Sequence, residues 1–424
     1  MRNLINHPFG APHINVSEKI VFTDNSPGVT DVAGFTAGGA GCDIRNKGTD
    51  RLDTAIIYSK TPCVAAGVFT TNDIQAAPVR LSRELLVGGR PMHGIVANSG
   101  NANACTGSRG MIDAKTMAEL AEKAVGAHRG SFFVGSTGRI GEWLPMSKLE
   151  KGIAEAGRRV SAIEAEGRRA AEAILTSDTR PKTCTARFEW QGAPVTVSGI
   201  AKGAGMIEPG MATMLAFVAT DAAISRDLLQ KLLWLANNRS FNTVTVDGDM
   251  STNDTVLVLA NGASGVEVTE SDYPLLALFR EALNRVCFAL AEKIVGDGEK
   301  ITKVVSVNIL GARTPDDAEK IARAIGNSLL VKSSWYGEDP NWGRLLDAAG
   351  YARVGIVEEK INLFYNNVPV MISGRPIPEN KPKWKEEVKH RRFAIHMDLG
   401  LGPADYQLLA SDLSAEYVNY NKSE

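Results

Sequence analysis

Residues 202–215 read KGAGMIEPGMATML, which places a threonine, Thr213, at the start of an apolar run directly after a glycine- and proline-rich turn. A threonine hydroxyl is a weak nucleophile, but the residue's own α-amine can activate it once the preceding peptide bond is cut. Such an amine has a pKa of about 7.7–8.0, which suits proton transfer near neutral pH. The small Ala212, with Pro209 and Gly210, permits the sharply turned backbone that an N→O acyl shift needs. The stretch therefore predicts self-cleavage between Ala212 and Thr213.

The same spacing also fits a plain glycine turn that leads into a buried strand, in which Thr213 only satisfies a hydrogen bond. Short motifs alone do not separate these two interpretations. The rest of the chain has to decide between them.

Apolar β-like runs and helical stretches lie on both sides of this segment. Ser225 is placed to cap a helix, and Leu275–Val295 has its apolar residues at helical spacing. Strands and helices do not alternate strictly, so we expect an α+β fold rather than a doubly wound parallel sheet. We expect a flexible turn at GFTAGGAG (34–41) and surface loops at 126–130 and 376–385. The expected strands are 54–59, 63–70, 94–98, 131–134, 214–220, 255–260, 303–310 and 392–399.

Composition narrows the class of protein. The chain has 424 residues, 44% of them hydrophobic and 22% charged, which indicates a folded globular protein with two domains or two lobes. Its 47 basic and 48 acidic residues give a net charge of -1, so nothing in the bulk charge favours nucleic acid or an anionic membrane as a partner. There is no long apolar run and no apolar core of a signal peptide, so we expect a cytoplasmic protein, or one in an organelle matrix after loss of a transit peptide.

Metal and disulfide sites are not expected either. The five cysteines are odd in number and lack C-x-x-C spacing, so we expect reduced, mostly packed thiols. The six histidines show no ligand spacing, so no zinc site is expected. Asp247, Asp249, Asn253 and Asp254 lie close together but lack the spacing of an EF-hand, so we expect them to tie down a loop.

The run 202–215 resembles the self-processing signature of the ornithine acetyltransferase family. Further blocks resemble that family's in the same order, and so many ordered matches identify the chain as a member. These blocks are GVFTTNDIQAAPV (67–79), ANSGNANACTG (97–107), GSTGRIGEWLPM (135–146), LTSDTRPK (175–182), SFNTVTVDGDMSTNDTVLVLANG (240–262), DGEKITK (297–303) and DPNWGRLLDAAG (339–350).

The resemblance implies roles for individual residues. Thr213 becomes the nucleophile, and Thr137 and Gly138 line the oxyanion hole, where a hydroxyl and an unhindered backbone N–H can donate to a developing negative charge. The remaining matches are substrate contacts, among which a carboxylate is suited to a charged amine. They are Thr179, Lys202, Glu299 and Asn421, together with Thr213 itself.

Two blocks depart from the family pattern. DGEKITK stands where the family commonly has DGEGATK, and Lys300 and Ile301 are expected to make the surroundings of Glu299 more basic and bulkier. The chain ends YVNYNKSE, which stops early, so that Asn421 matches a family contact while Ser423 is out of register. Ser423 as a substrate contact is therefore in doubt.

Taken together, the resemblance implies a layered α/β/β/α sandwich with two lobes, made as a precursor that is cut into an α-chain, 1–212, and a β-chain, 213–424. Acetyl passes from N-acetylornithine to glutamate through acetyl-Thr213 in arginine biosynthesis, with no metal or organic cofactor. An α2β2 assembly is expected, and use of acetyl-CoA as a second donor is left open. The alternatives are a self-cleaving amidase or aminopeptidase, in which water replaces glutamate, and a non-catalytic scaffold, which would lack the cut.

Overall fold

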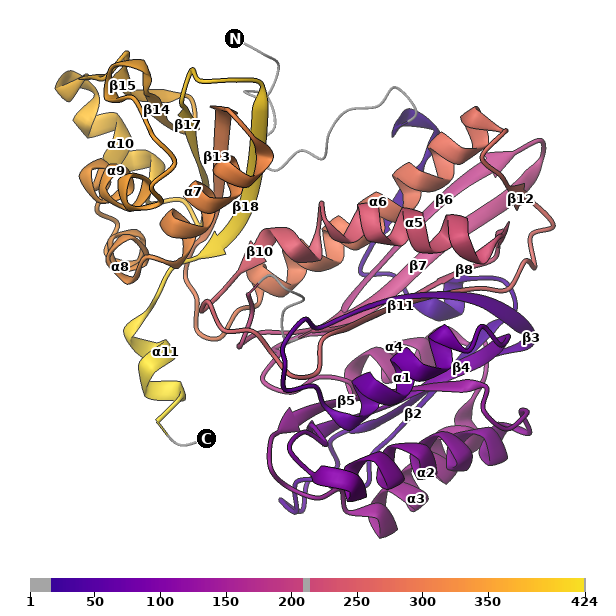
Figure 1. Ribbon diagram of the computed structural model, residues 1–424. Coiled ribbons are helices and arrows are strands. Elements are labelled where there is room, and N and C mark those ends of the chain that lie inside the picture. Colours follow the sequence, from indigo (N-terminus) through magenta and orange to yellow (C-terminus); the bar gives the residue numbers. More distant parts are fainter. Residues whose placement is uncertain (1–16, 209–213, 423–424) are drawn as a thin grey trace.

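The computed structural model describes residues 17–208 and 214–422 and shows two lobes, each built on its own large sheet (Figure 1). The larger lobe contains a nine-stranded sheet in the order β1-β6-β7-β8-β11-β3-β4-β5, with β2 also paired to β3. Its strands are β1 (Val21–Asp24), β2 (Phe35–Ala40), β3 (Thr54–Phe69), β4 (Met92–Asn101), β5 (Phe132–Arg139), β6 (Lys182–Trp190), β7 (Ala193–Lys202), β8 (Leu215–Thr220) and β11 (Thr255–Ala260).

Strand β3 turns this sheet into two layers. Its residues 64–69 pair with β11, whereas its residues 54–59 pair with β2 and, for most of that length, with β4. The register with β4 shifts between Tyr58 and Cys63, where the chain passes from one layer to the other. The sequence predicted separate strands at 54–59 and 63–70, and they form one continuous strand of 16 residues.

Helices cover both outer faces of the folded sheet, which confirms the α/β/β/α layering. On one side, α5 (Arg226–Asn237) and α6 (Tyr273–Gly296) pack against β6, β7 and β8. On the other, α1 (Ala77–Val87), α2 (Gly107–Val125) and α3 (Met146–Arg159) pack against β3, β4 and β5. Between the layers, Leu215 and Phe217 of β8 share an apolar core with Ala97 and Phe133. The predicted cap is present, because the Ser225 hydroxyl accepts from Leu228 N–H at 3.4 Å.

The expected flexible turn at 34–41 is wrong, because most of it is strand β2. Here the glycines allow two helices to pack closely on the strand, and they do not form a turn. A Cβ at Gly38 would lie 2.3 Å from the Ala156 carbonyl oxygen of α3, and one at Gly39 would lie 2.6 Å from the Arg169 carbonyl oxygen of α4 (Glu164–Ala173). Both helices therefore lie directly on the backbone of β2.

The smaller lobe is a seven-stranded sheet in the order β10-β18-β13-β17-β14-β15-β16. The expected loop 376–385 is partly wrong, because its second half starts helix α10 (Lys381–Glu387). Trp384 holds this helix against the lobe, because its side chain is buried and its Nε1 donates to the Pro369 carbonyl at 3.0 Å. The remaining elements of the lobe are β10 (Val244–Thr245), β13 (Val304–Ala312), β14 (Asn362–Tyr365), β15 (Val368–Ile372), β16 (Arg375–Pro376), β17 (Arg392–Asp398), β18 (Ala404–Ser411), α7 (Pro315–Asn327), α8 (Leu329–Tyr336) and α9 (Trp342–Tyr351).

Short elements complete the described chain: β9 (Ala223–Ile224) pairs with β12 (Glu267–Val268), and α11 (Ala415–Tyr420) lies near the C-terminus. Apart from β10, the strands of the smaller lobe come from residues 304–411. Strands β7 and β8, on opposite sides of the expected cut, are neighbours in one sheet. None of the helices in 17–208 or 214–422 is long and apolar enough to cross a membrane.

Candidate active site

The segment that joins β7 to β8 is held at both ends. Lys202, the last residue of β7, pairs with Leu215, the first residue of β8. Ala212 and Thr213 lie outside the described residues. Met214, which follows them, is fixed by two contacts: its N–H donates to Asp254 Oδ1 at 3.0 Å, and its carbonyl accepts from Thr255 N–H at 3.1 Å. The chain therefore enters β8 at a defined place beside the start of β11.

Thr137 lies on the facing layer, close to this entry point. A Cβ at Gly135 of β5 would lie 3.0 Å from the Phe217 ring, and side chains two apart in a strand point to the same face, so Thr137 also faces the β8 layer. Asn253 shows that this end of β5 meets the start of β8. Its Nδ2 donates to the Ser136 carbonyl at 2.8 Å, and it directly precedes Asp254, which holds Met214.

Gly138 follows Thr137 with a φ of +134°, in the region that favours glycine. A Cβ at this position would lie 2.3 Å from the Gly100 carbonyl carbon, so no other residue fits without movement of β4. Glycine at position 138 therefore allows the end of β5 to lie directly against the backbone of β4.

Lys202 is not the solvated lysine that its sequence alone would suggest. Its side chain is 2% exposed, and its Nζ lies 3.8 Å from Asp178 Oδ2. Lys182 and Asp297 complete a buried group of four charges: Lys182 Nζ lies 2.5 Å from Asp178 Oδ1 and 2.7 Å from Asp297 Oδ2. Asp178 also accepts from Gly203 N–H at 2.7 Å, so it binds the first residue of the β7–β8 segment as well.

These charges control each other's protonation. Burial lowers the pKa of Lys202, and the Asp178 carboxylate opposes that shift most strongly. Burial by itself would raise the pKa of Asp178, but the charges of Lys202 and Lys182 outweigh it and hold the pKa well below its usual range. Asp178 is therefore the main counter-ion that keeps Lys202 charged in the protein interior.

Glu299 brings three distant segments together. Its carboxylate lies against Gly205, where a Cβ would be 2.6 Å from Cδ, so only glycine leaves room for it. Its backbone N–H donates to the Ala204 carbonyl at 2.9 Å, and its Oε2 accepts from Asn421 Nδ2 at 3.2 Å. Thr179 lies on the other side of the same turn, where its N–H donates to Asp297 Oδ2 at 3.0 Å. The structure thus gathers Thr179, Lys202, Glu299 and Asn421 around residues 203–208.

Two aromatic residues of α11, Tyr417 and Tyr420, also contact this region. Tyr417 Oη donates to Asp247 Oδ2 at 3.3 Å, and the same carboxylate accepts from Met206 N–H at 2.6 Å and Ile207 N–H at 2.8 Å. Asp247 thus ties down a loop, as expected, although the loop is the β7–β8 segment rather than its own. The ammonium of Lys300 lies 5.0 Å from the Tyr420 ring centroid, so the basic departure from the family pattern does lie near Asn421. Ser423 lies outside the described residues.

Three carboxylates were not predicted as parts of the site: Asp178, Asp297 and Asp254. All three stand within the blocks quoted above, and Asp178 and Asp297 come one position before Thr179 and two positions before Glu299, which could have pointed to them. Asp254 is fully buried, its Oδ2 has no hydrogen-bond partner among the described residues, and burial raises its pKa well above the usual value.

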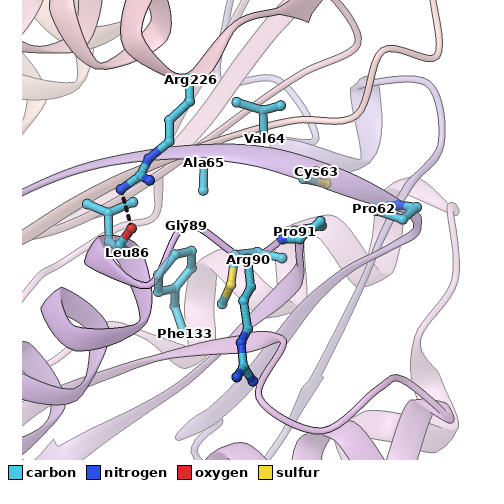
Figure 2. Close-up of a pocket in the computed structure, with 11 residues that line it drawn as sticks. Pro62, Cys63, Val64, Ala65, Leu86, Gly89, Arg90, Pro91, Phe133 and Arg226 are labelled. Atoms are coloured by element: carbon cyan, nitrogen blue, oxygen red, sulfur yellow. Dashed lines mark hydrogen bonds between the residues drawn. The ribbon is translucent and has the colours of Figure 1, made fainter.

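A cavity of about 200 Å³ lies elsewhere, at the other end of the two layers (Figure 2). It is lined by Phe133, near the start of β5, and by Cys63, Met92 and Arg226, whose guanidinium donates to the Leu86 carbonyl. Because Thr137 lies at the opposite end of β5, this cavity is not the site described above.

Known proteins resemble this chain over most of its length. The family model described as the ArgJ family matches residues 36–423. The arginine biosynthesis bifunctional protein ArgJ of Symbiobacterium thermophilum is 45% identical over 397 residues, covering 93% of this chain and 98% of that protein. The corresponding protein of Thermotoga neapolitana is 42% identical, covering 92% and 98%. A solved structure of ornithine acetyltransferase complexed with ornithine, from Mycobacterium tuberculosis, is 35% identical, covers 45% of this chain and 98% of that chain, and has a TM-score of 0.41.

Proposed function

Since this chain belongs to the ArgJ family, it is an acyltransferase of arginine biosynthesis, and we propose that it moves acetyl from N-acetylornithine to glutamate through Thr213. The observation that supports this most is the meeting of separate segments at Glu299. Gly205 of the β7–β8 segment and Asn421 of the C-terminal region both contact its carboxylate. The Glu299 carboxylate is thereby held against a residue that precedes Thr213 by 213 − 205 = 8 positions in the chain.

The first step of the proposal is self-cleavage. The hydroxyl of Thr213 attacks the carbonyl of Ala212, the acyl group shifts from nitrogen to oxygen, and water then hydrolyses the ester. This gives an α-chain, 1–212, and a β-chain, 213–424, with a free α-amine on Thr213. The two chains would stay together, because β7 and β8 pair along their length and β11 pairs with β3.

In the acyl transfer, the new α-amine takes the hydroxyl proton of Thr213 as the oxygen attacks the acetyl carbonyl. The Thr137 side chain and Gly138 backbone stabilise the resulting oxyanion from the facing layer. Ornithine leaves as its nitrogen takes that proton from the α-ammonium. The amine of glutamate then attacks the acetyl-threonine ester, and a proton from that amine passes through the α-amine to the Thr213 oxygen and regenerates the hydroxyl. The chemistry needs only positioned groups of this chain and its substrates.

Charge divides the substrate contacts into two kinds. Lys202 is a buried cation, and it suits the carboxylate that N-acetylornithine and glutamate share. Glu299 is suited to the side-chain ammonium of N-acetylornithine. Thr179, which is bonded to Asp297, and Asn421, which is bonded to Glu299, add polar contacts, while a role for Ser423 is not included.

Several finer features belong to the same proposal. We expect the cut chains to assemble as α2β2 in the cytoplasm, and acetyl-CoA is the candidate for a second acetyl donor. Hydrolysis in place of transfer is not proposed, since the family match covers the complete described site.

An assay of product formation tests the proposal. Purified protein is incubated with N-acetylornithine, and N-acetylglutamate and ornithine are measured with and without glutamate. We expect sustained formation of both products only when glutamate is present, at most one equivalent of ornithine per enzyme without it, and neither product with Thr213→Ala. Release of acetate at the same rate without glutamate would show a hydrolase and contradict the proposal.

A further inference from the structure

Asp297 determines which hydrogen bonds Thr179 can make to a ligand. The Thr179 hydroxyl donates to Asp297 Oδ1, and its backbone N–H donates to Oδ2 at 3.0 Å. Oδ2 also accepts from the buried ammonium of Lys182 at 2.7 Å. A hydroxyl has one hydrogen and two lone pairs, so the only hydroxyl hydrogen of Thr179 is used in the bond to Asp297. The exposed side of Thr179 can then only accept a hydrogen bond.

The same reasoning applies to Asn421. Its Nδ2 donates to Glu299 Oε2 at 3.2 Å and to the Tyr417 carbonyl at 3.1 Å. Both partners are acceptors, which fixes the orientation of the amide and uses both of its hydrogens. Its Oδ1 is left as an acceptor, and Glu299 is an acceptor by its charge. Thr179, Glu299 and Asn421 therefore offer a ligand acceptors but no spare donor.

We propose that Asp297 is a positioning residue that fixes Thr179 as a hydrogen-bond acceptor and so directs it onto the side-chain ammonium of N-acetylornithine. This inference rests on the proposed function. An ammonium group has three N–H donors, which matches the three acceptors around the 297–299 turn. Neither Thr179 nor Asn421 can then bind the substrate carboxylate, which is left to Lys202. Asp297 thus favours an acetyl donor with a charged side chain, although Asp297 itself does not contact that substrate.

Two acetyl donors with the same three-carbon side chain, one with and one without a terminal ammonium, test this selection. N-acetylnorvaline has the side chain of N-acetylornithine without the ammonium. We expect Thr179→Val and Asp297→Asn to lower kcat/KM for N-acetylornithine about 10- to 100-fold, the range for a hydrogen bond to a charged group. For N-acetylnorvaline the same variants should change kcat/KM by less than about threefold. Thr179→Ser keeps the hydroxyl and should retain the preference.

The chain offers a matched control in Asp412. Its Oδ1 accepts from Thr302 N–H at 2.9 Å and its Oδ2 from the Thr302 hydroxyl at 2.5 Å, the same pattern as Asp297 with Thr179. Asp412→Asn should affect the two acetyl donors equally. If Asp297→Asn and Thr179→Val also affect them equally, Asp297 is only structural and the inference is wrong.

Thr179→Val carries the test even where Asp297→Asn fails to fold, because it leaves the Asp297–Lys182 ion pair intact. Failure of the proposed function is a different outcome. In that case the unmodified protein transfers no acetyl from N-acetylornithine to glutamate, and the inference falls with it.

Discussion

Replacing Asp178 by asparagine tests whether a buried counter-ion keeps Lys202 charged. At the observed 3.8 Å, two unit charges attract by about 4 kcal/mol at an effective dielectric constant of about 20. Asparagine keeps the shape and an acceptor for Gly203 N–H but removes this attraction. Since burial already lowers the pKa of Lys202 and Asp178 is the largest opposing charge, the variant should lower that pKa further.

The sign of the pH effect follows from the chemistry of an ammonium group. Lys202 is charged below its pKa and neutral above it, so a lower pKa removes the charge at a lower pH. If Lys202 binds the substrate carboxylate, the alkaline fall of kcat/KM should begin at a lower pH in Asp178→Asn than in the unmodified enzyme. We also expect a loss of about 3–5 kcal/mol in unfolding free energy, as for a buried ion pair that loses one partner.

The assay is kcat/KM for N-acetylornithine across the pH range, with thermal unfolding measured on the same samples. Asp53 provides the control, because it is a buried carboxylate that accepts from Cys42 N–H and Ile44 N–H, both at 2.8 Å, without a lysine. Asp53→Asn should lower stability and leave the alkaline limit where it is. An unmoved alkaline limit in Asp178→Asn would refute the reasoning.

Two further substitutions test other parts of the account. Thr137→Ala should lower kcat about 10²- to 10³-fold with little change in KM, because the oxyanion contact is made in the transition state. Steady-state kinetics check this, and a kcat within a few-fold of the unmodified enzyme would make Thr137 structural. Trp384→Ala should cost about 3–5 kcal/mol, because the side chain is buried and donates to Pro369; denaturant unfolding followed in the smaller lobe checks this, and a loss below about 1 kcal/mol would place Trp384 outside the core.

Much of the fold could be predicted from local pattern. The strands at 94–98, 214–220 and 255–260 and the helix Leu275–Val295 were recognisable because apolar periodicity reflects burial directly. The β2 strand was missed because glycine is a turn signal in sequence. Gly38 and Gly39 are needed only because Ala156 and Arg169, 156 − 38 = 118 and 169 − 39 = 130 positions further along the chain, lie on their backbone. That requirement is set by tertiary packing.

The candidate site divides in the same way. Thr179, Lys202, Glu299 and Asn421 could be proposed from ordered motifs, and the structure gathers them around the β7–β8 segment. Their supporting carboxylates could not be assigned, because Asp178 and Asp297 look like ordinary loop residues until Lys182 and Lys202 are seen to be buried beside them. A charge pair between residues 115 positions apart has no local signature.

The central claim is that acetyl rests on Thr213 between the two substrates. The most direct measurement is rapid-quench mass spectrometry of the protein mixed with N-acetylornithine and no glutamate. The account predicts a β-chain beginning Thr-Met-Leu that gains one acetyl group on Thr213 and loses it when glutamate is added. Labelled acetyl that reaches glutamate from an uncut chain, or without ever appearing on Thr213, would contradict it.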